Sequence, residues 1–526
     1  ISTDSLRLFL KSSFPKRFNK ENYSNKYSFE IFLPYLFPTR PYSTAEISEL
    51  APECVGLPQN NKKFCNTSPT KIWARYCQAV RGVWVKPTLL AIANDNNDKL
   101  NCSRSLRLGT DSKDKVIEAS NQGVDTIITT LNKFSLEKMP NIENLTFDGI
   151  GNANLTGNKQ NNIIVAGDGH DNLYGGLGND SLYGGLGNDR FIINIGDGND
   201  VINGYVNAQT DIDDASNKDT LDYSQITTAG YFAEVNLSTT SAYVKTGATI
   251  EQTDTISNIE NIIGSSGNDI LKGNSEVNTI SGGIGNDTIS GGSGSDKLEG
   301  NSGDDIFVDT NFTGDTIDGG TDSTLGDTID YSNLSSKITL VLEDSGATTS
   351  VKVGNTTSDH TISNIENIYG STVADEITGN NQSNTILGYA GDDTIDGGEG
   401  ADYLDGGAGV NTISFKSFTS SVTVNLSTNS SGETGETILN FRNILGTDNS
   451  SQSDTLIGNN DANKIEGLAG NDTLEGLGGN DTLDGGNGND VFILRANDGI
   501  DTIDGASGSG DTVDYTNLTA SQNLSL

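Results

Sequence analysis

The sequence predicts an all-β protein, a parallel β-solenoid assembled from short repeats. Three observations lead to this prediction: 63 of the 526 residues are glycine, only 33% are hydrophobic, and a nine-residue pattern recurs in register after about residue 110. So low a hydrophobic fraction argues against one large globular core, and a fixed short period is the signature of a repeat architecture. Such a chain buries its apolar side chains between stacked neighbouring repeats.

The repeat reads Gly-Gly-x-Gly-x-Asp-x-U-x, where U is a large apolar residue, and its plainest copies are 282–290 and 291–299. It forms four blocks, at roughly 157–193, 264–308, 370–414 and 458–493. Each copy predicts a six-residue turn, in which glycine permits φ > 0 or a close approach, followed by a three-residue strand. The U residues are expected to point inward and stack on one another: Leu173, Leu182, Phe191, Ile289, Leu298, Phe307, Ile395, Leu404, Leu483 and Phe492.

A larger unit encloses each block. An Ile-Glu-Asn strand leads in at 141–145, 258–262 and 364–368, and more loosely at 440–444. A repeat with asparagine in place of aspartate follows, at Asn162, Asn278, Asn384 and Asn463. Asp-Tyr-Ser or a relative leads out, before alternating strands such as 338–342 and 422–426. This pattern predicts units at 108–262, 263–368, 369–444 and 445–526, the last running into a fifth, so the chain is expected to be part of something longer.

Residues 1–107 differ in composition from the repeats. They hold all four cysteines, both tryptophans and eight of the nine prolines, and basic residues outnumber acidic ones there. The spacing of Cys54, Cys65, Cys77 and Cys102 does not match a zinc knuckle, which leaves two disulfides or free thiols. This segment is of unknown fold: a cap, an attachment domain or a misjoined piece of sequence.

The aspartates of the repeats are predicted to form columns. Two nonapeptides make one coil of 18 residues, so Asp171 faces Asp189, Asp287 faces both Asp269 and Asp305, and Asp472 faces Asp490. Stacked strands lie about 4.8 Å apart. Carboxylates at that distance repel by roughly 3 kcal/mol for each pair at an effective dielectric constant near 20. A divalent cation between them converts this repulsion into binding.

The donors available in the repeats favour calcium as that cation. Carboxylates and turn carbonyls are hard oxygen donors, and calcium accepts six to eight of them in flexible geometry. Magnesium demands a tighter octahedron, whereas zinc prefers histidine or cysteine. The repeat part holds only His170 and His360, and His170 is interpreted as filling a turn.

These repeats resemble the RTX (repeats-in-toxin) or haemolysin-type calcium-binding family, in a surface-layer or adhesin-like member. The resemblance covers about residues 110–526 and implies a right-handed parallel β-roll, or β-helix solenoid, with several Ca²⁺ ions between its turns. It also implies the ligands: carbonyls at turn positions two and four with the aspartate of one turn, and carbonyls at positions one and three with the aspartate one coil later. One such site joins Gly283, Gly285 and Asp287 to Gly300, Ser302 and Asp305.

Carried along the repeats, the resemblance implies this set of metal ligands: Gly167, Gly169, Asp171, Gly176, Gly178, Asp180, Gly184, Leu186, Asp189, Asp200, Ser265, Gly267, Asp269, Gly282, Gly283, Ile284, Gly285, Asp287, Gly292, Gly294, Asp296, Gly300, Ser302, Asp305, Asp375, Gly388, Ala390, Gly391, Asp393, Asp402, Leu468, Gly470, Asp472, Gly476, Gly478, Asp481, Gly485, Asn487, Asp490 and Asp501.

Some positions depart from the pattern. Pairs that contain Asn278, Asn384, Asn411 or Asn463 lose one charge and are expected to bind calcium more weakly. Asp180 and Asp481 have their next aspartate 20 residues later, at Asp200 and Asp501, which predicts a bulge. Four further acids in Gly-Asp-Thr-Ile-Asp segments either extend the columns or lie outside them: Asp315, Asp318, Asp327 and Asp330.

The net charge and the absence of known catalytic motifs exclude several classes of partner and of enzyme. A formal net charge of −39 argues against nucleic acid or anionic lipid as a partner, and no run of 18 apolar residues predicts a membrane span. H-E-x-x-H, G-x-S-x-G and Walker motifs are absent from the sequence, and calcium accounts for the paired carboxylates, so we expect no enzyme.

The resemblance implies type I secretion, an extracellular or cell-surface location and folding on contact with external calcium. We therefore expect a structural cell-surface protein: a surface layer, sheath, filament or adhesin. Its partners would be calcium and either further copies of itself, as a homo-polymer, or a cell-surface polysaccharide. The alternative is the calcium-folding tail of a secreted hydrolase or toxin whose catalytic part is absent here.

Overall fold

The computed structural model describes residues 124–205, 217–309, 314–344, 348–354 and 360–516, and the backbone of three earlier strands. Those strands are β1 (Leu90–Ala93), β2 (Leu106–Leu108) and β3 (Lys115–Glu118). Every regular element of the described part is a strand, as the sequence predicted, and no helix there could span a membrane. The segment 1–107 lies outside the described residues, apart from β1 and the start of β2.

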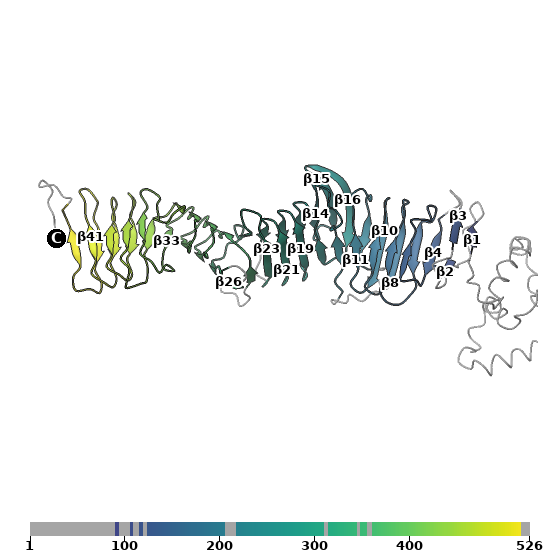
Figure 1. Cartoon of the computed structure of the whole chain (residues 1–526), viewed down its shortest axis with the longest axis horizontal. Coiled ribbons are helices and arrows are strands. Elements are labelled where there is room, and N and C mark those ends of the chain that lie inside the picture. Colours follow the sequence, from purple (N-terminus) through teal and green to yellow (C-terminus); the bar gives the residue numbers. More distant parts are fainter. Residues whose placement is uncertain are drawn as a thin grey trace, which may run out of the picture. The chain divides into compact units, whose positions relative to one another are not determined.

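The chain divides into two units. One comprises Ile1–Asp95 and Asp111–Ala119 and contains the parallel pair β1–β3. The other comprises Asn96–Thr110 and Ser120–Leu526 and contains all the remaining strands. In this second unit the strands of the described residues stack as successive coils (Figure 1), and they form two parallel ladders.

Ladder one starts with β2 and continues, in the order of its pairings, through β4 (Thr126–Thr129), β6 (Asn144–Phe147), β8 (Ile163–Asp168), β10 (Ser181–Leu186), β12 (Val201–Asn203) and β16 (Thr249–Ser257). It resumes with β14 (Tyr231–Asn236), β18 (Ile270–Lys272), β20 (Thr288–Ser290), β22 (Ile306–Val308), β24 (Thr328–Asp330), β28 (Asn367–Tyr369), β30 (Thr385–Leu387), β32 (Tyr403–Asp405) and β35 (Thr437–Leu439). Its last part is β34 (Thr423–Asn425), β37 (Thr455–Ile457), β39 (Thr473–Glu475), β41 (Val491–Ile493) and β43 (Thr512–Asp514).

Ladder two runs through β5 (Lys133–Ser135), β7 (Asn154–Thr156), β9 (Asn172–Tyr174), β11 (Arg190–Ile192), β13 (Thr220–Asp222), β17 (Asn261–Ile263), β19 (Thr279–Ile284), β21 (Lys297–Ser302), β23 (Thr316–Thr321) and β27 (His360–Ser363). It resumes with β25 (Ile338–Val341), β29 (Glu376–Thr378), β31 (Thr394–Asp396), β33 (Thr412–Ser414), β36 (Asn443–Leu445), β38 (Lys464–Glu466), β40 (Thr482–Asp484) and β42 (Thr502–Asp504).

The register confirms the 18-residue coil. In ladder one Leu271 pairs with Ile289 and Ile289 with Phe307, each 18 residues further along. The predicted bulges are also present, because Leu182 pairs with Ile202 and Leu483 with Ile503. All ten U residues named above are buried, with at most 3% of their surface exposed. The core therefore lies between the two ladders, built from one apolar side chain of each short strand.

Some strands are longer than the three residues predicted. β10, β19, β21 and β23 each have six residues. The reason is that the first turn residues stack in register as well, so that Gly283 pairs with Asn301 and Ile284 with Ser302. The turn is thus part of the ladder.

The alternating strands between blocks fold as antiparallel excursions, which we call junctions; the described residues hold three. At the first, β14, β15 (Ser241–Thr246) and β16 form an antiparallel meander that projects from the stack (Figure 1). At the second, β25, β26 (Thr349–Val353) and β27 form an antiparallel meander that belongs to ladder two. The third, between β34 and β35, has a single antiparallel bridge, Asn425 to Ser430.

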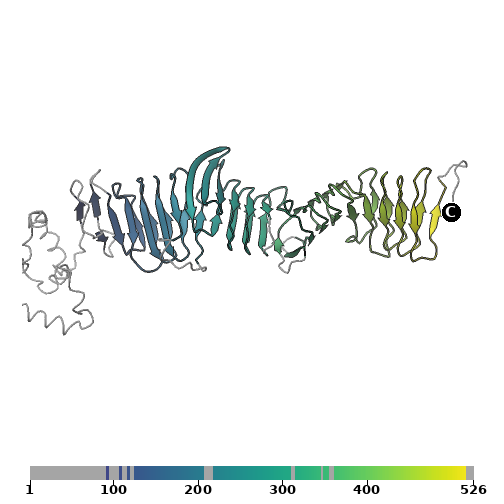
Figure 2. The same ribbon diagram turned by 180° about the vertical axis from the view of Figure 1, so that it is seen from behind.

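The opposite ladder passes each junction unbroken. β13 pairs directly with β17 beside the first, β24 with β28 beside the second, and β33 with β36 beside the third. Figure 2 shows the stacked strands from the opposite side. The aromatic residues of the leading-out motif, Tyr223, Tyr331 and Phe415, are buried where each block ends. The junctions therefore interrupt one ladder at a time while the core stays filled.

Candidate metal-binding columns

In most coils the residue directly before a ladder strand occupies an equivalent place, and we call it, and any residue in the same register position of a longer strand, the slot residue. The backbone N–H of one slot residue donates to the side chain of the slot residue one coil later. Asp171 N donates to Asp189 Oδ1 at 2.8 Å, and Asp472 N to Asp490 Oδ1 at 2.9 Å. The aspartate pairs predicted from the 18-residue spacing are thus direct neighbours. The 20-residue pairs are joined in the same way, Asp180 N to Asp200 Oδ1 at 2.8 Å and Asp481 N to Asp501 Oδ1 at 3.0 Å.

The second carboxylate oxygen of these aspartates is buried against the turn. It folds back over the first glycine of its own repeat, so that a Cβ added to Gly282 would lie 2.2 Å from Asp287 Oδ2. Glycine is required there because of this close approach. In the described structure, twelve slot aspartates have a buried Oδ2 that no hydrogen-bond donor reaches: Asp171, Asp180, Asp189, Asp219, Asp287, Asp296, Asp305, Asp327, Asp393, Asp472, Asp481 and Asp490.

Burial makes these carboxylates costly as anions. Desolvation, with a smaller contribution from neighbouring aspartates, raises the pKa of Asp189 and of Asp287 from 3.8 to about 8. The same causes raise the pKa of Asp180 and of Asp472 to about 7. A buried anion needs a compensating cation, and oxygen atoms in stacked turns are donors that calcium accepts. The residues present therefore fit calcium.

The backbone supplies further oxygen donors beside each column. Gly283 and Gly285 have φ of 111° and 125°, and Gly167 and Gly169 have φ of 104° and 141°, a region that glycine reaches without strain. The expected site at Leu468, Gly470 and Asp472 places a leucine at φ 69° in the same turn position.

The expected position-three ligands already accept one hydrogen bond each. The carbonyls of Leu186, Ser302 and Asn487 receive N–H groups from Gly169, Gly285 and Gly470 one coil earlier, each at 2.8 Å. A carbonyl oxygen keeps a second lone pair. The structure thus brings the expected donors of both coils together.

In three of the described slots a nearby serine or threonine satisfies the aspartate. Asp269 Oδ2 accepts the N–H of Ser265 at 2.5 Å, and Asp375 Oδ2 accepts that of Ser371 at 2.6 Å. The hydroxyls of these serines donate to the Oδ1 atoms, at 2.7 and 2.8 Å. Asp454 is held similarly by Thr447. Of the expected ligands, Ser265, Asp269 and Asp375 therefore lie in coils whose acid already has donors of its own.

The asparagine slots have a different arrangement. The side-chain amides of Asn162, Asn278, Asn384 and Asn463 donate to the backbone carbonyl of the slot residue one coil earlier, at 2.7–3.0 Å. Those earlier residues are Glu143, Glu260, Glu366 and Arg442, the third residues of the leading-in motifs. An amide nitrogen that donates a hydrogen bond is no metal ligand. This is a physical reason for the weaker calcium binding expected at these positions.

The four acids left open by the sequence separate into two pairs. Asp315 and Asp327 are slot residues, because Asp315 Oδ1 accepts Asp296 N at 2.8 Å and Asp327 Oδ1 accepts Asp305 N at 2.6 Å. Asp318 lies inside β23 and Asp330 at the end of β24, both outside the columns, where they accept hydrogen bonds from Asn364 and Ser332.

Sequence reasoning missed several slot acids. Asp219 Oδ1 accepts Asp189 N at 2.7 Å, and Asp254 Oδ1 accepts Asp200 N at 2.8 Å, although neither follows a Gly-Gly-x-Gly turn. A signal was present: each begins an Asp-Thr-apolar triplet, as Asp287 does. Asp454 and Asp511 share this triplet and also lie in a column, joined to Asp472 and Asp490.

His170 belongs to a second hydrogen-bond ladder, formed by the fifth residue of each turn. Its N–H donates to Asn152 Oδ1 at 3.0 Å, and its Nδ1 accepts the N–H of Asn188 at 2.7 Å. In other coils an asparagine side chain is the acceptor at this position; Asn286 Oδ1, for example, accepts the N–H of Asp304 at 3.1 Å. The interpretation of His170 as a turn residue is confirmed.

Comparison with known families agrees with this geometry. The profile described as RTX calcium-binding nonapeptide repeat (4 copies) matches residues 151–191, 256–289, 273–307, 366–413 and 453–492. No curated protein matches the chain. Of the twelve slot aspartates named above, the matched segments contain all except Asp219 and Asp327. Since the family profile and the geometry select the same coils, the repeats between residues 151 and 492 are RTX calcium-binding nonapeptide repeats.

Proposed function

We propose that the chain is a secreted structural protein of the cell surface, whose repeat part folds into its β-roll when it meets extracellular calcium. The observation that carries this proposal is the set of buried carboxylate oxygens that lack a donor within the described residues. They stack coil upon coil, so the folded state without a cation contains a line of uncompensated buried charge.

The net negative charge of the chain explains why folding would require calcium. A chain with net charge −39 and 33% hydrophobic residues resists collapse when no cation neutralises it. An ion that binds the folded columns and not the unfolded chain contributes its binding free energy to folding. Extracellular calcium-binding modules have typical dissociation constants of about 10⁻⁴–10⁻³ M, so millimolar calcium outside the cell fills them. RTX repeats are typical of proteins exported by type I secretion, which supports an extracellular location.

A structural role, without catalysis, is the use we propose for the folded roll. The paired carboxylates that would suggest hydrolytic chemistry each have one oxygen held by the backbone of the neighbouring coil, as Asp305 Oδ1 is by Asp287 N at 2.7 Å. They are thus part of the stacking itself. We propose a surface layer, sheath, filament or adhesin, with copies of the same chain or a cell-surface polysaccharide as partners.

Calcium titration of the full chain tests the proposal. With a chelator present, far-ultraviolet circular dichroism should show an unfolded chain; added calcium should restore the strand signal, whereas equimolar magnesium should not. Electron microscopy after calcium addition should show ordered layers or filaments. A chain that keeps its strand signal in the chelator contradicts calcium-driven folding. Calcium-folded monomers that never assemble would favour the alternative, a folding tail of a secreted hydrolase or toxin.

A further inference from the structure

A buried cluster at the second junction has a donor set unlike that of the columns. It consists of Asp309, Asp315 and His360, which are at most 6% exposed. Their potential ligand atoms all lie within 4.8 Å of one another. His360 Nδ1 is 3.3 Å from Asp309 Oδ2 and 4.0 Å from Asp315 Oδ2.

The fold brings these residues together from distant parts of the sequence. Thr316 pairs with Thr361, so His360 is the slot residue one coil after the slot residue Asp315. An imidazole therefore stands where the columns elsewhere carry a carboxylate. Asp309 directly follows β22, and its N–H donates to the carbonyl of Asp330 one coil later, at 3.1 Å.

The first junction provides an internal reference. There Val201 pairs with Thr255, which makes Asp254 the slot residue after Asp200. Ile193, whose N–H donates to the carbonyl of Asp222 at 3.0 Å, stands where the second junction has Asp309. The second junction thus replaces an aspartate by His360 and an apolar residue by Asp309. Stacking alone requires neither replacement, because the first junction forms without them.

Tyr331 provides a separate observation. Its side chain is 0% exposed, and within the described residues its hydroxyl meets no hydrogen-bond partner. Burial first, and then the charges of Asp309 and Asp315, raise the pKa of Tyr331 well above its ordinary value. The Tyr331 and His360 rings meet edge to face, with centroids 6.5 Å apart.

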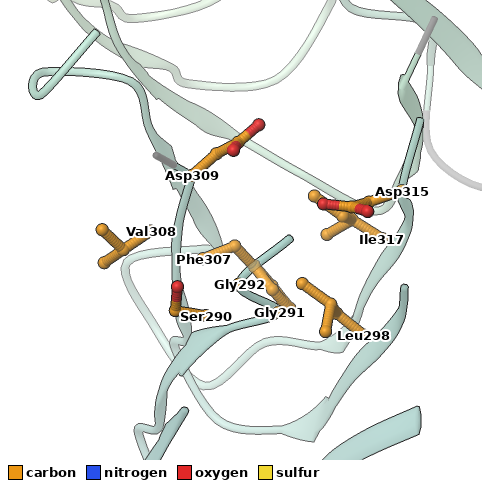
Figure 3. A pocket seen from close by; sticks show the side chains of 9 residues that line it. All are labelled: Ser290, Gly291, Gly292, Leu298, Phe307, Val308, Asp309, Asp315 and Ile317. Atoms are coloured by element: carbon orange, nitrogen blue, oxygen red, sulfur yellow. The ribbon is translucent and has the colours of Figure 1, made fainter. Parts of the chain in front are cut away.

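A small cavity lies beside the cluster. Figure 3 shows Asp309 and Asp315 on two sides of it, and the apolar side chains of Leu298, Phe307 and Ile317 line much of the remainder. Its volume of about 10 Å³ is close to what one water molecule needs. The site thus has room for one small additional ligand.

We propose that Asp309, Asp315 and His360 bind a divalent transition metal of the zinc class, separate from the calcium of the columns. Zinc bonds of about 2.0–2.2 Å place neighbouring tetrahedral ligand atoms about 3.3–3.6 Å apart. The 3.3 Å separation of His360 and Asp309 fits, and the 4.0 Å separation of His360 and Asp315 needs a small contraction. Imidazole nitrogen suits zinc and its neighbours in the transition series, whereas calcium takes oxygen.

The surroundings complete the site. Asp315 Oδ1 accepts the N–H of Asp296 at 2.8 Å, and this hydrogen bond orients the carboxylate so that its Oδ2 faces His360. The cavity holds a water as the fourth ligand, and the Tyr331 hydroxyl donates a hydrogen bond to the ligand shell. Because the three side chains are buried, the metal enters as the chain folds.

The test refolds the full chain from chelator in saturating calcium, with its cysteines alkylated so that thiols do not bind zinc. Bound zinc is measured by equilibrium dialysis and elemental analysis, and Co²⁺ reports the coordination by its visible spectrum. We expect one tightly bound zinc per chain. His360→Asp and Asp309→Ile, which install the residues of the first junction, should each weaken zinc binding at least tenfold and leave calcium-dependent folding intact. His360→Gln and Asp309→Asn, closer in size, should do the same.

His170→Asn is the matched control, since it removes the other histidine from a turn in which asparagine serves elsewhere. It should retain zinc. Wild type that binds no tight zinc in saturating calcium would overturn the proposal and leave His360 and Asp309 as buried neighbours without a metal. Zinc retained in full by His360→Gln or lost in His170→Asn would overturn it as well. Should the first pair of variants not fold, the second pair and the Co²⁺ spectrum of wild type decide.

Discussion

Aspartate and asparagine occupy the same slot in neighbouring coils and do opposite things there. Asp287 and Asn278 are both buried, and both donate their N–H to an aspartate one coil later, at 2.7 and 2.8 Å. The Asn278 amide also donates to the carbonyl of Glu260 at 2.7 Å, and its Oδ1 accepts the N–H of Asn274 at 2.9 Å. No donor in the described structure reaches Asp287 Oδ2.

The exchange of a carboxylate oxygen for an amide nitrogen decides whether the side chain in the slot finds a hydrogen-bond partner within the protein. The four leading-in motifs are each followed by an asparagine slot whose amide joins two coils directly. The aspartate coils that follow leave a charge to be neutralised. Each unit therefore starts with a slot that needs no ion, and calcium-dependent slots follow it. Four predictions test this contrast.

Asn278→Ala should have the largest effect, a loss of about 2–4 kcal/mol of local stability, because it leaves the buried carbonyl of Glu260 without its donor. The loss should be the same at saturating calcium and at the lowest calcium concentration at which the chain is folded. Hydrogen exchange across 258–300 measures it. Asn268→Ala, an exposed asparagine of the neighbouring turn, is the control and should cost under about 1 kcal/mol. A loss that calcium repairs would contradict the contrast.

A change of pH should alter the stability of the aspartate slots and leave that of the asparagine slots unchanged. In the calcium-free roll the pKa values of Asp189 and Asp287 stand near 8, above the ordinary 3.8. A carboxyl group with a raised pKa favours the folded state below pH 4, and this stabilisation is lost as the pH rises through 8. The calcium-free coils should therefore be most stable in mild acid.

Calcium must displace those protons, so its binding should strengthen from pH 6 to pH 8, by up to about tenfold per pH unit for each proton released. Titrations followed by circular dichroism at several pH values, with proton release recorded in a pH-stat, provide the check. A calcium midpoint that does not change over this range would show that the slot carboxyls are already ionised.

Asp287→Asn converts a calcium-dependent aspartate slot into an asparagine slot. It removes one charge from a column in which Asp269, Asp287 and Asp305 follow one another. We expect the calcium midpoint of this block to rise by roughly tenfold, equivalent to about 1.4 kcal/mol, and the calcium-free block to lose little. Calorimetric titration measures the midpoint. Asp461→Asn makes the same charge change at an exposed turn position and should leave it unaltered.

His170→Asn should have the smallest effect, within about 0.5 kcal/mol, because asparagine supplies the acceptor that Asn188 N uses now. Calcium stoichiometry should not change either. Denaturation in saturating calcium is the measurement. A lost calcium ion would mean that the imidazole contacts the metal, against the hydrogen-bond ladder seen here.

The strict period made the coils and most columns predictable. Eighteen-residue spacing identified the partner of Asp287, and the 20-residue spacing after Asp180 identified a bulge that the structure contains. Prediction was poorer where a junction intervenes. Asp189 and Asp219 are 30 residues apart and Asp200 and Asp254 are 54 apart, distances set by inserted loops and strands that follow no period.

Two other features depend on contacts that a pattern does not reveal. Asp269 and Asp287 share the same repeat position, but Asp269 has Ser265 in its turn where Asp287 has Gly283, and the structure shows that this serine satisfies the carboxylate. Asp309 and His360 meet because β27 returns to β23 after an antiparallel excursion. Neither spacing nor composition could place that histidine beside those acids.

The alternation of the junctions governs how the stack would carry tension. The first and third excursions interrupt ladder one and the second interrupts ladder two, while the opposite ladder stays paired at each point. A force along the stack therefore acts on a continuous ladder of parallel strands on one side of each junction and on an extensible antiparallel meander on the other. The side that carries the meander changes from one junction to the next. Each junction would then yield by opening its meander before the paired ladder separates, and the calcium columns of the adjoining blocks would be spared the load.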